Sequence, residues 1–219
     1  MATSTVENYV KHIFLEQELL SEGPVPMGRV AKAVGVTPGS ATSMMKTLSD
    51  AELVNYEPRV GVKLTKSGRR LALRVLRRAR LIEYFLVKTL DMDWTEINDE
   101  AEELEHVISD RVLDALDAFL GNPKTDPHGD PIPTAEGNYE QRTLKALSQC
   151  KTDQLVRIAQ ITDQEPEFLN FAVTSGLTPG VDLQVTQRIE AADAITLSIG
   201  GETAITIGSA AAEKILVEA

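Results

Sequence analysis

Apolar residues near the start of the chain recur at the three- and four-residue spacing of an amphipathic helix. The repeating positions are Val6, Tyr9, Val10, Ile13 and Phe14. A spacing of i, i+3, i+4, i+7 and i+8 places these side chains on one face, so a first helix with one buried face is predicted. Gly23 and Pro24 interrupt the pattern and separate this helix from the next.

Two shorter helices are predicted next. "MGRVAKAVGV" (27–36) has helical periodicity and is closed by Gly35. In the following stretch Thr37 is a good N-cap, and Pro38 suits the first helical position, where its missing N–H costs nothing. The third helix is therefore expected to run from Pro38 to about Asp50.

A β-hairpin is predicted from "LVNYEPRVGVKLT" (53–65), which has two β-prone arms and a turn that contains Pro58 and Gly61. Helices followed by a hairpin in this order make a winged helix-turn-helix. We expect this DNA-binding domain to cover residues 1–73.

Three further helices are predicted after the hairpin. One is long (65–90), one is N-capped by Thr95, and one covers "SDRVLDALDAFLG" and stops at Gly121. The last helix has an apolar face that is wider than a short helical hairpin could cover, so we expect a homodimer, which also suits a DNA site with two halves. These helices would form a dimerisation domain over residues 74–140. The apolar face consists of Val112, Leu113, Leu116 and Phe119.

The last third of the chain has a sequence pattern that is typical of β-structure. Residues 121–139 are rich in Pro and Gly, which indicates a linker or boundary. After about Thr143, short β-prone runs such as "VDLQVTQRI" and "AITLSI" are separated by glycines. They predict a small barrel of about five strands over 141–219, with "PEFLNFAVTSG" as an inserted helix. The fold class is therefore mainly α with a small β part.

Charge divides the chain in two. The net charge is −11, yet residues 1–90 hold 14 Lys and Arg against 8 Asp and Glu, and residues 91–219 hold 8 against 25. A basic half suits a polyanion such as DNA, and an acidic half suits a cation. The chain has no long apolar run, no signal-like start and a single cysteine, Cys150. We therefore expect a cytoplasmic protein without a membrane span.

The third helix occupies the recognition position of the predicted DNA-binding domain. Its small polar side chains would let the helix end approach the major groove and make single hydrogen bonds to bases. Affinity is expected to come from phosphate contacts by basic side chains of the domain, among them Arg29, Lys32 and Lys66. The main candidates for DNA contact are Thr37, Pro38, Gly39, Ser40, Thr42, Ser43, Lys46, Arg59 and Lys63.

The helix over "DEAEELEHVISD" (99–110) is crowded with carboxylates. Glu102, Glu105 and His106 fall at i, i+3 and i+4, so all three project from one face. Two carboxylates and an imidazole suit a divalent metal ion, whereas a solvated acidic face is the simpler alternative. A di-iron enzyme would need a second Glu-x-x-His pair, which a chain with three histidines does not provide. Catalysis is therefore not expected.

The order of these parts resembles the diphtheria-toxin-repressor family of metal-dependent transcription regulators. The resemblance is carried by "ENYVKHIF", "NDEAEELEHVISD" and "PHGDPIP", and the tail "GLTPGVDLQV…ITLSIGGETAITI" is similar to the family's SH3-like domain. It implies a primary metal site completed by a first-helix residue, here Asn8. The family's ancillary site is represented only by Glu83, because Ala79 and Asn98 stand where its histidines would be.

The resemblance implies a repressor that binds a double-stranded DNA operator when Mn(II) or Fe(II) joins the first helix to the acidic helix. Oxygen-bearing side chains at Asn8 and Glu102, where the iron branch has Met and Cys, favour Mn(II). The general affinity order of divalent ions makes Zn(II) binding possible in vitro. A different hypothesis is a winged-helix regulator that senses an organic ligand or a partner protein without metal.

Overall fold

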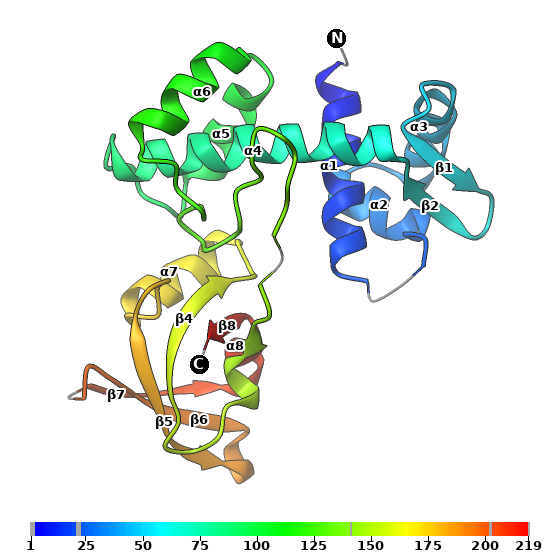
Figure 1. The fold of residues 1–219 in the computed structure, drawn as a ribbon. Helices are drawn as coiled ribbons and strands as arrows, with labels where there is room; N and C mark the ends of the chain where they lie inside the picture. Colours follow the sequence, from blue (N-terminus) through cyan, green and yellow to red (C-terminus); the bar gives the residue numbers. More distant parts are fainter. Residues whose placement is uncertain (1–2, 21–22, 141, 202, 219) are drawn as a thin grey trace. The chain divides into compact units, whose positions relative to one another are not determined.

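The computed structural model describes all residues except 1–2, 21–22, 141, 202 and 219 (Figure 1). The chain divides into two compact units. Unit 1 contains residues 1–79, 102–114 and 133–139, and unit 2 contains residues 80–101, 115–132 and 140–219. No helix among the described residues is both long enough and apolar enough to cross a membrane.

Unit 1 contains the winged helix-turn-helix that the sequence predicts. Thr37 caps the third helix by accepting a hydrogen bond from the Ser40 backbone N–H at 3.2 Å, and Pro38 is the first helical residue. Gly35 ends the second helix in the left-handed conformation, with φ of 72°. The elements are α1 (Ser4–Glu18), α2 (Met27–Val34), α3 (Pro38–Asp50), β1 (Val54–Glu57) and β2 (Gly61–Leu64).

The wing hairpin is joined to the helices through its second strand. β1 and β2 pair antiparallel from Val54↔Leu64 to Glu57↔Gly61. The backbones of Val25 and Val62 exchange two hydrogen bonds, of 2.8 and 3.0 Å. Gly61 has φ of +142°, and a Cβ there would overlap the Val25 carbonyl oxygen, so only glycine permits this close approach.

Three helices follow the wing: α4 (Lys66–Lys88), α5 (Ile97–Glu105) and α6 (Asp110–Phe119). The predicted N-cap at Thr95 is wrong, because α5 begins two residues later. The Thr95 hydroxyl instead donates a hydrogen bond to Asp93 at 2.8 Å, which forms a turn before the helix.

Unit 2 contains the predicted small β-domain. Its sheet has six strands in the order β3-β8-β4-β5-β6-β7, and every neighbouring pair is antiparallel. The predicted helix is present as α7 (Pro166–Thr174). The strand runs singled out in the sequence did not include the short first and last strands. The remaining elements are β3 (Lys145–Ala146), β4 (Leu155–Ile161), β5 (Asp182–Ile189), β6 (Ala194–Ile199), β7 (Thr203–Gly208), α8 (Ser209–Glu213) and β8 (Ile215–Glu218).

Each unit has its own hydrophobic core. In unit 1, α1 contributes Ile13 and Phe14, which pack in one buried cluster with Met45 and Leu48 of α3. In unit 2, Leu169 of α7 packs in a cluster with the inward side chains of the sheet. Because α1 packs in the core of the DNA-binding domain, any contact that holds α1 also acts on the recognition helix.

Candidate metal centres and DNA-binding surface

The nine residues predicted to contact DNA all lie on the surface of unit 1, on α3 and on the wing. Two of the hydroxyls serve the helix itself: Thr37 makes the N-cap, and Thr42 donates to the Pro38 carbonyl at 2.8 Å. Arg59 lies at the wing tip with a positive φ of 69°. Of the predicted phosphate contacts, Arg29 is engaged within the protein, since its Nε donates to Glu16 at 2.5 Å.

Residues of α1 and α5 meet in a polar cluster inside unit 1, which we call the junction. It consists of Glu7, Asn8, Lys11, Glu102, Glu105 and His106. Glu102 and Glu105 lie on the last turn of α5, and His106 is the residue that follows the helix. The four junction residues that the sequence predicts as ligands lie in this one cluster, where Asn8 contacts Glu102 and His106 contacts Glu105. Among the described residues, the ligand atoms of Glu102, Glu105 and His106 do not all come within 4.8 Å of one another.

His106 is held in an orientation that suits metal coordination. Its Nδ1 lies 2.8 Å from Glu7 Oε2, and because a carboxylate only accepts, Nδ1 is the donor. In the neutral imidazole the lone pair is then on Nε2, which is buried and has no hydrogen-bond partner among the described residues. Arg78 lies 3.6 Å from the other oxygen of Glu7 and holds that carboxylate in place.

Two more junction oxygens are buried without a partner. The Asn8 amide donates to Glu102 Oε1 at 2.8 Å, which leaves Asn8 Oδ1 without a hydrogen bond in the described part of the chain. Glu105 Oε2 is also buried and has no hydrogen-bond partner among the described residues. Buried polar atoms are rarely left unsatisfied, so three such atoms in one cluster fit a cation that binds oxygen and nitrogen.

Glu105 is the most deeply buried member of the junction, with no exposed surface. Burial raises the pKa of its carboxyl, while the Lys11 ammonium opposes that shift. Lys11 Nζ lies 2.5 Å from Glu105 Oε1, and His106 Nε2 lies 3.4 Å from the same oxygen. The junction therefore already contains one cation, on one oxygen of Glu105.

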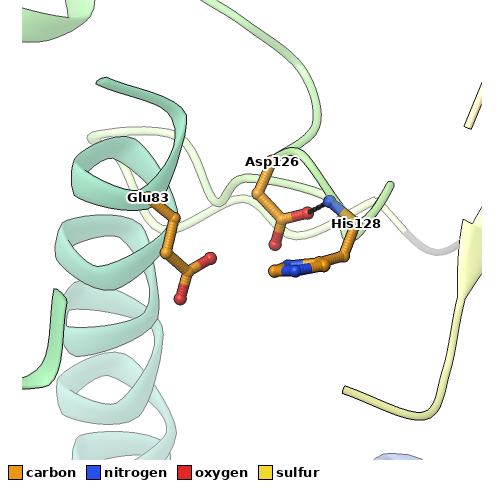
Figure 2. Close-up of side chains that lie close together, drawn as sticks. All are labelled: Glu83, Asp126 and His128. Atoms are coloured by element: carbon orange, nitrogen blue, oxygen red, sulfur yellow. Dashed lines mark hydrogen bonds between the residues drawn. The ribbon is translucent and has the colours of Figure 1, made fainter. Parts of the chain in front are cut away.

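Glu83 lies outside the junction, in a second cluster within unit 2. Its carboxylate on α4 faces the side chains of Asp126 and His128 from the loop after α6 (Figure 2). One ligand atom from each of the three residues can be chosen so that all lie within 4.8 Å of one another. We call these residues the loop cluster.

His128 is also held in an orientation that suits metal coordination. Its Nε2 lies 3.2 Å from the Trp94 carbonyl oxygen, and because a carbonyl only accepts, Nε2 is the donor. Nδ1 therefore holds the lone pair, and it has no partner among the residues that the structure describes. Stacking against the Trp94 ring at 5.1 Å holds the imidazole in place. Burial lowers the pKa of His128, which favours the neutral form that metals bind.

Asp126 of the loop cluster shares the guanidinium of Arg80 with the nearby Asp130. Arg80 lies 3.5 Å from Asp126 and 3.1 Å from Asp130. Burial raises the pKa of Asp126 well above its usual range, and the charges of Asp130 and Glu83 add to this effect. Carboxylates and a neutral imidazole placed this close together are ligands that a divalent cation accepts.

The loop that carries Asp126 and His128 is held by hydrogen bonds within itself and by hydrogen bonds from the β-domain. Asp126 Oδ1 accepts backbone hydrogen bonds from His128 and Asp130, at 2.8 and 3.0 Å. Gln160 of β4 and Gln164 of the segment between β4 and α7 each donate to Asp130 at 3.0 Å. The β-domain thus supports the loop cluster through hydrogen bonds to Asp130.

Asp126 and His128 were not among the ligands predicted from the sequence. The structure places His128 in a buried turn. The available signal was "DPHGD" (126–130), in which acidic residues and a histidine are close together. Their distance of more than forty positions from Glu83 hid the pairing.

Gly129 is expected to be essential for the shape of this loop. It has φ of +91°, and a Cβ would overlap the Ala159 carbonyl oxygen. Gly129→Ala should lower the free energy of unfolding by about 2 kcal/mol more than Gly121→Ala, because overpacking against backbone is added to the unfavourable φ. Gly121, with φ of +81° and no atom near its Cβ position, is the matched control. Urea denaturation measures both, and equal losses would contradict the close approach.

Three family models match the chain in order. The model described as "Iron dependent repressor, N-terminal DNA binding domain" matches residues 1–62. The model described as "Iron dependent repressor, metal binding and dimerisation domain" matches residues 65–134, and the FeoA domain matches residues 145–219.

Known repressors are similar to this chain over most of its length. The diphtheria toxin repressor of Corynebacterium jeikeium (strain K411) is 30% identical over 167 residues, which cover 74% of this chain and 68% of the relative. A solved manganese-dependent transcriptional repressor in complex with manganese is 37% identical, with a TM-score of 0.87 over 97% of this chain and 98% of the other. A solved structure of ScaR with bound Zn²⁺ is 30% identical, with a TM-score of 0.78 over 97% and 98%. The chain therefore belongs to the diphtheria-toxin-repressor family of metal-dependent, DNA-binding transcriptional repressors.

Proposed function

We propose that this repressor binds a double-stranded DNA operator as a homodimer when Mn(II) or Fe(II) is held at the junction. The observation that carries the proposal is a set of buried atoms there that have no hydrogen-bond partner among the described residues: His106 Nε2, Glu105 Oε2 and Asn8 Oδ1. Together with the Glu102 carboxylate they offer oxygen and nitrogen donors of the kind that Mn(II) and Fe(II) accept, and Zn(II) can bind the same donors in vitro.

The ligands come from two parts of unit 1 that are distant in sequence. Asn8 is on α1, whose apolar face lies in the core of the DNA-binding domain, and the other ligands are on α5 or just after it. When bound, the ion would supply the positive charge that holds the α5 carboxylates against α1. Glu7 keeps the imidazole of His106 turned toward the site, and Arg78 keeps Glu7 in place. This arrangement couples metal binding to the position of α1.

The loop cluster is proposed as a second divalent site. Its ligands would be Glu83, Asp126 and the Nδ1 atom of His128. An ion there would hold the loop against α4, the helix that also begins the dimerisation region. Ion binding would then favour the folded loop.

The surfaces needed for operator binding are available. The α3 and wing residues are exposed, and basic side chains such as Lys46 and Lys63 lie among them. On α6, Val112 is 56% exposed and Phe119 is 70% exposed, although Leu113 is buried. We propose that these exposed apolar residues form part of the homodimer interface, which would set two recognition helices on two operator half-sites.

Metal removal tests the proposal directly. A fluorescently labelled operator fragment is titrated with protein in excess chelator and then after Mn(II) is restored. We expect tight binding only with metal, and a salt dependence that reflects neutralised phosphates. Equal binding in both conditions would reject metal activation and favour a regulator that senses an organic ligand or a partner protein.

A further inference from the structure

Lys11 is a buried lysine at the centre of the junction. Only 8% of its surface is exposed, and its ammonium lies 2.5 Å from Glu105 Oε1. Lysine is almost never buried unless it is paired, because removing its charge from water is costly. Lys11 follows Asn8 by three residues on α1, so the two side chains reach α5 from the same face of the helix.

Glu105 divides its two oxygens between different partners. Oε1 is bound by the Lys11 ammonium, while Oε2 has no partner among the described residues and belongs to the proposed ion site. A carboxylate with a cation at each oxygen is the arrangement found where one carboxylate bridges two metal ions. Here one of the two cation positions is occupied by the protein itself.

The charges of the junction also indicate that it has room for Lys11 and one divalent ion. The junction carboxylates are Glu7, Glu102 and Glu105, which carry three negative charges when all are ionised. Lys11 and one divalent ion balance these three charges, while Arg78 is shared with Asp110 at 3.0 Å. A second divalent ion would leave an uncompensated charge of about +2 in a buried cluster, which is strongly unfavourable.

We infer that Lys11 is a built-in second cation of the junction. It limits the junction to one divalent ion, and it ties α1 to α5 before that ion binds. The inference rests on the proposed function, because it assumes that the junction holds an ion. It assigns to Lys11 the roles of setting the ion count and of positioning α1.

The ion count is tested in a His128→Gln background, which removes a ligand of the loop cluster. Calorimetric titration with Mn(II) should find one ion per chain in this background and two after Lys11→Glu is added, because the new carboxylate replaces the ammonium. Electron paramagnetic resonance should change from the spectrum of isolated Mn(II) to that of a coupled pair. Lys151→Glu, the same charge change at an exposed lysine of unit 2, should leave the count at one.

A second variant tests the tie between the helices and does not depend on metal. Lys11→Met keeps the length of the side chain and removes the charge. In metal-free protein, its melting temperature should fall by about 5 °C or more, because Glu105 stays buried without its partner. Saturating Mn(II) should reduce this difference. Circular dichroism at 20 °C establishes that each variant is folded.

The outcomes separate the inference from the proposed function. If Lys11→Glu still binds one ion, or if metal-free Lys11→Met melts like the parent, the role of Lys11 is rejected and the junction site stands. Suppose that the His128→Gln protein binds no ion and that adding Lys11→Glu lets it bind one. Lys11 would then occupy the single cation position of the junction, and its role as a second cation is rejected. If neither binds an ion, the proposed junction site is rejected, and the inference is rejected with it.

Discussion

His106→Ala is expected to abolish Mn(II)-dependent operator binding and to leave the fold intact. The substitution removes Nε2, the one nitrogen donor proposed for the junction, and releases Glu7 from its hydrogen bond. Mn(II) affinity at the junction should fall by about 100-fold or more, since even residues that only orient a ligand contribute 10- to 100-fold. Fluorescence anisotropy with a labelled operator at increasing Mn(II) measures the effect.

The control for this variant is Glu103→Gln, which alters an exposed carboxylate of α5, three residues before His106. It should keep a normal Mn(II) response. A His106→Ala protein that still responds normally to Mn(II) would show that His106 is not a ligand. A loss of helical circular dichroism would instead identify His106 as a packing residue.

Arg80→Met is expected to destabilise the metal-free protein by about 3–5 kcal/mol, because it leaves buried carboxylates without their cation. The Arg80 side chain is 6% exposed. Its guanidinium lies beside Asp126 and Asp130 and also donates to the Pro131 carbonyl at 2.6 Å. Chemical denaturation of metal-free protein gives the change in unfolding free energy. Mn(II) should recover part of the loss, because a divalent ion would compensate the same carboxylates.

Arg157→Met provides the comparison for Arg80. Arg157 also pairs with an aspartate in unit 2, but both partners are about half exposed. Solvent screens such pairs, so little or no change in stability is expected. Similar losses in the two variants would mean that burial of Arg80 does not determine the strength of its contacts. A stability of Arg80→Met that does not respond to Mn(II) would argue against an ion at the loop cluster.

Local signals predicted most of the secondary structure. Thr37 and Pro38 identified the start of α3 because a capping hydroxyl and a fixed φ act within one turn of the chain. The start of α5 was misplaced because Asp93 competes for Thr95 through a hydrogen bond that helix periodicity does not reveal. The short strands β3 and β8 were not among the predicted runs, since short segments that pair across the sheet carry little pattern of their own.

The sequence by itself determined the winged helix-turn-helix, the acidic helix and the small β-domain, and it predicted Glu102, Glu105 and His106 as ligands from their spacing. These features follow from spacing along one helix or strand, where neighbours in space are also near neighbours in the chain. Only the tertiary structure decided that Lys11 binds Glu105 and that Asp126 and His128 face Glu83. Contacts of this kind depend on how an irregular loop and two helices pack, because distance along the chain does not determine distance in the folded protein.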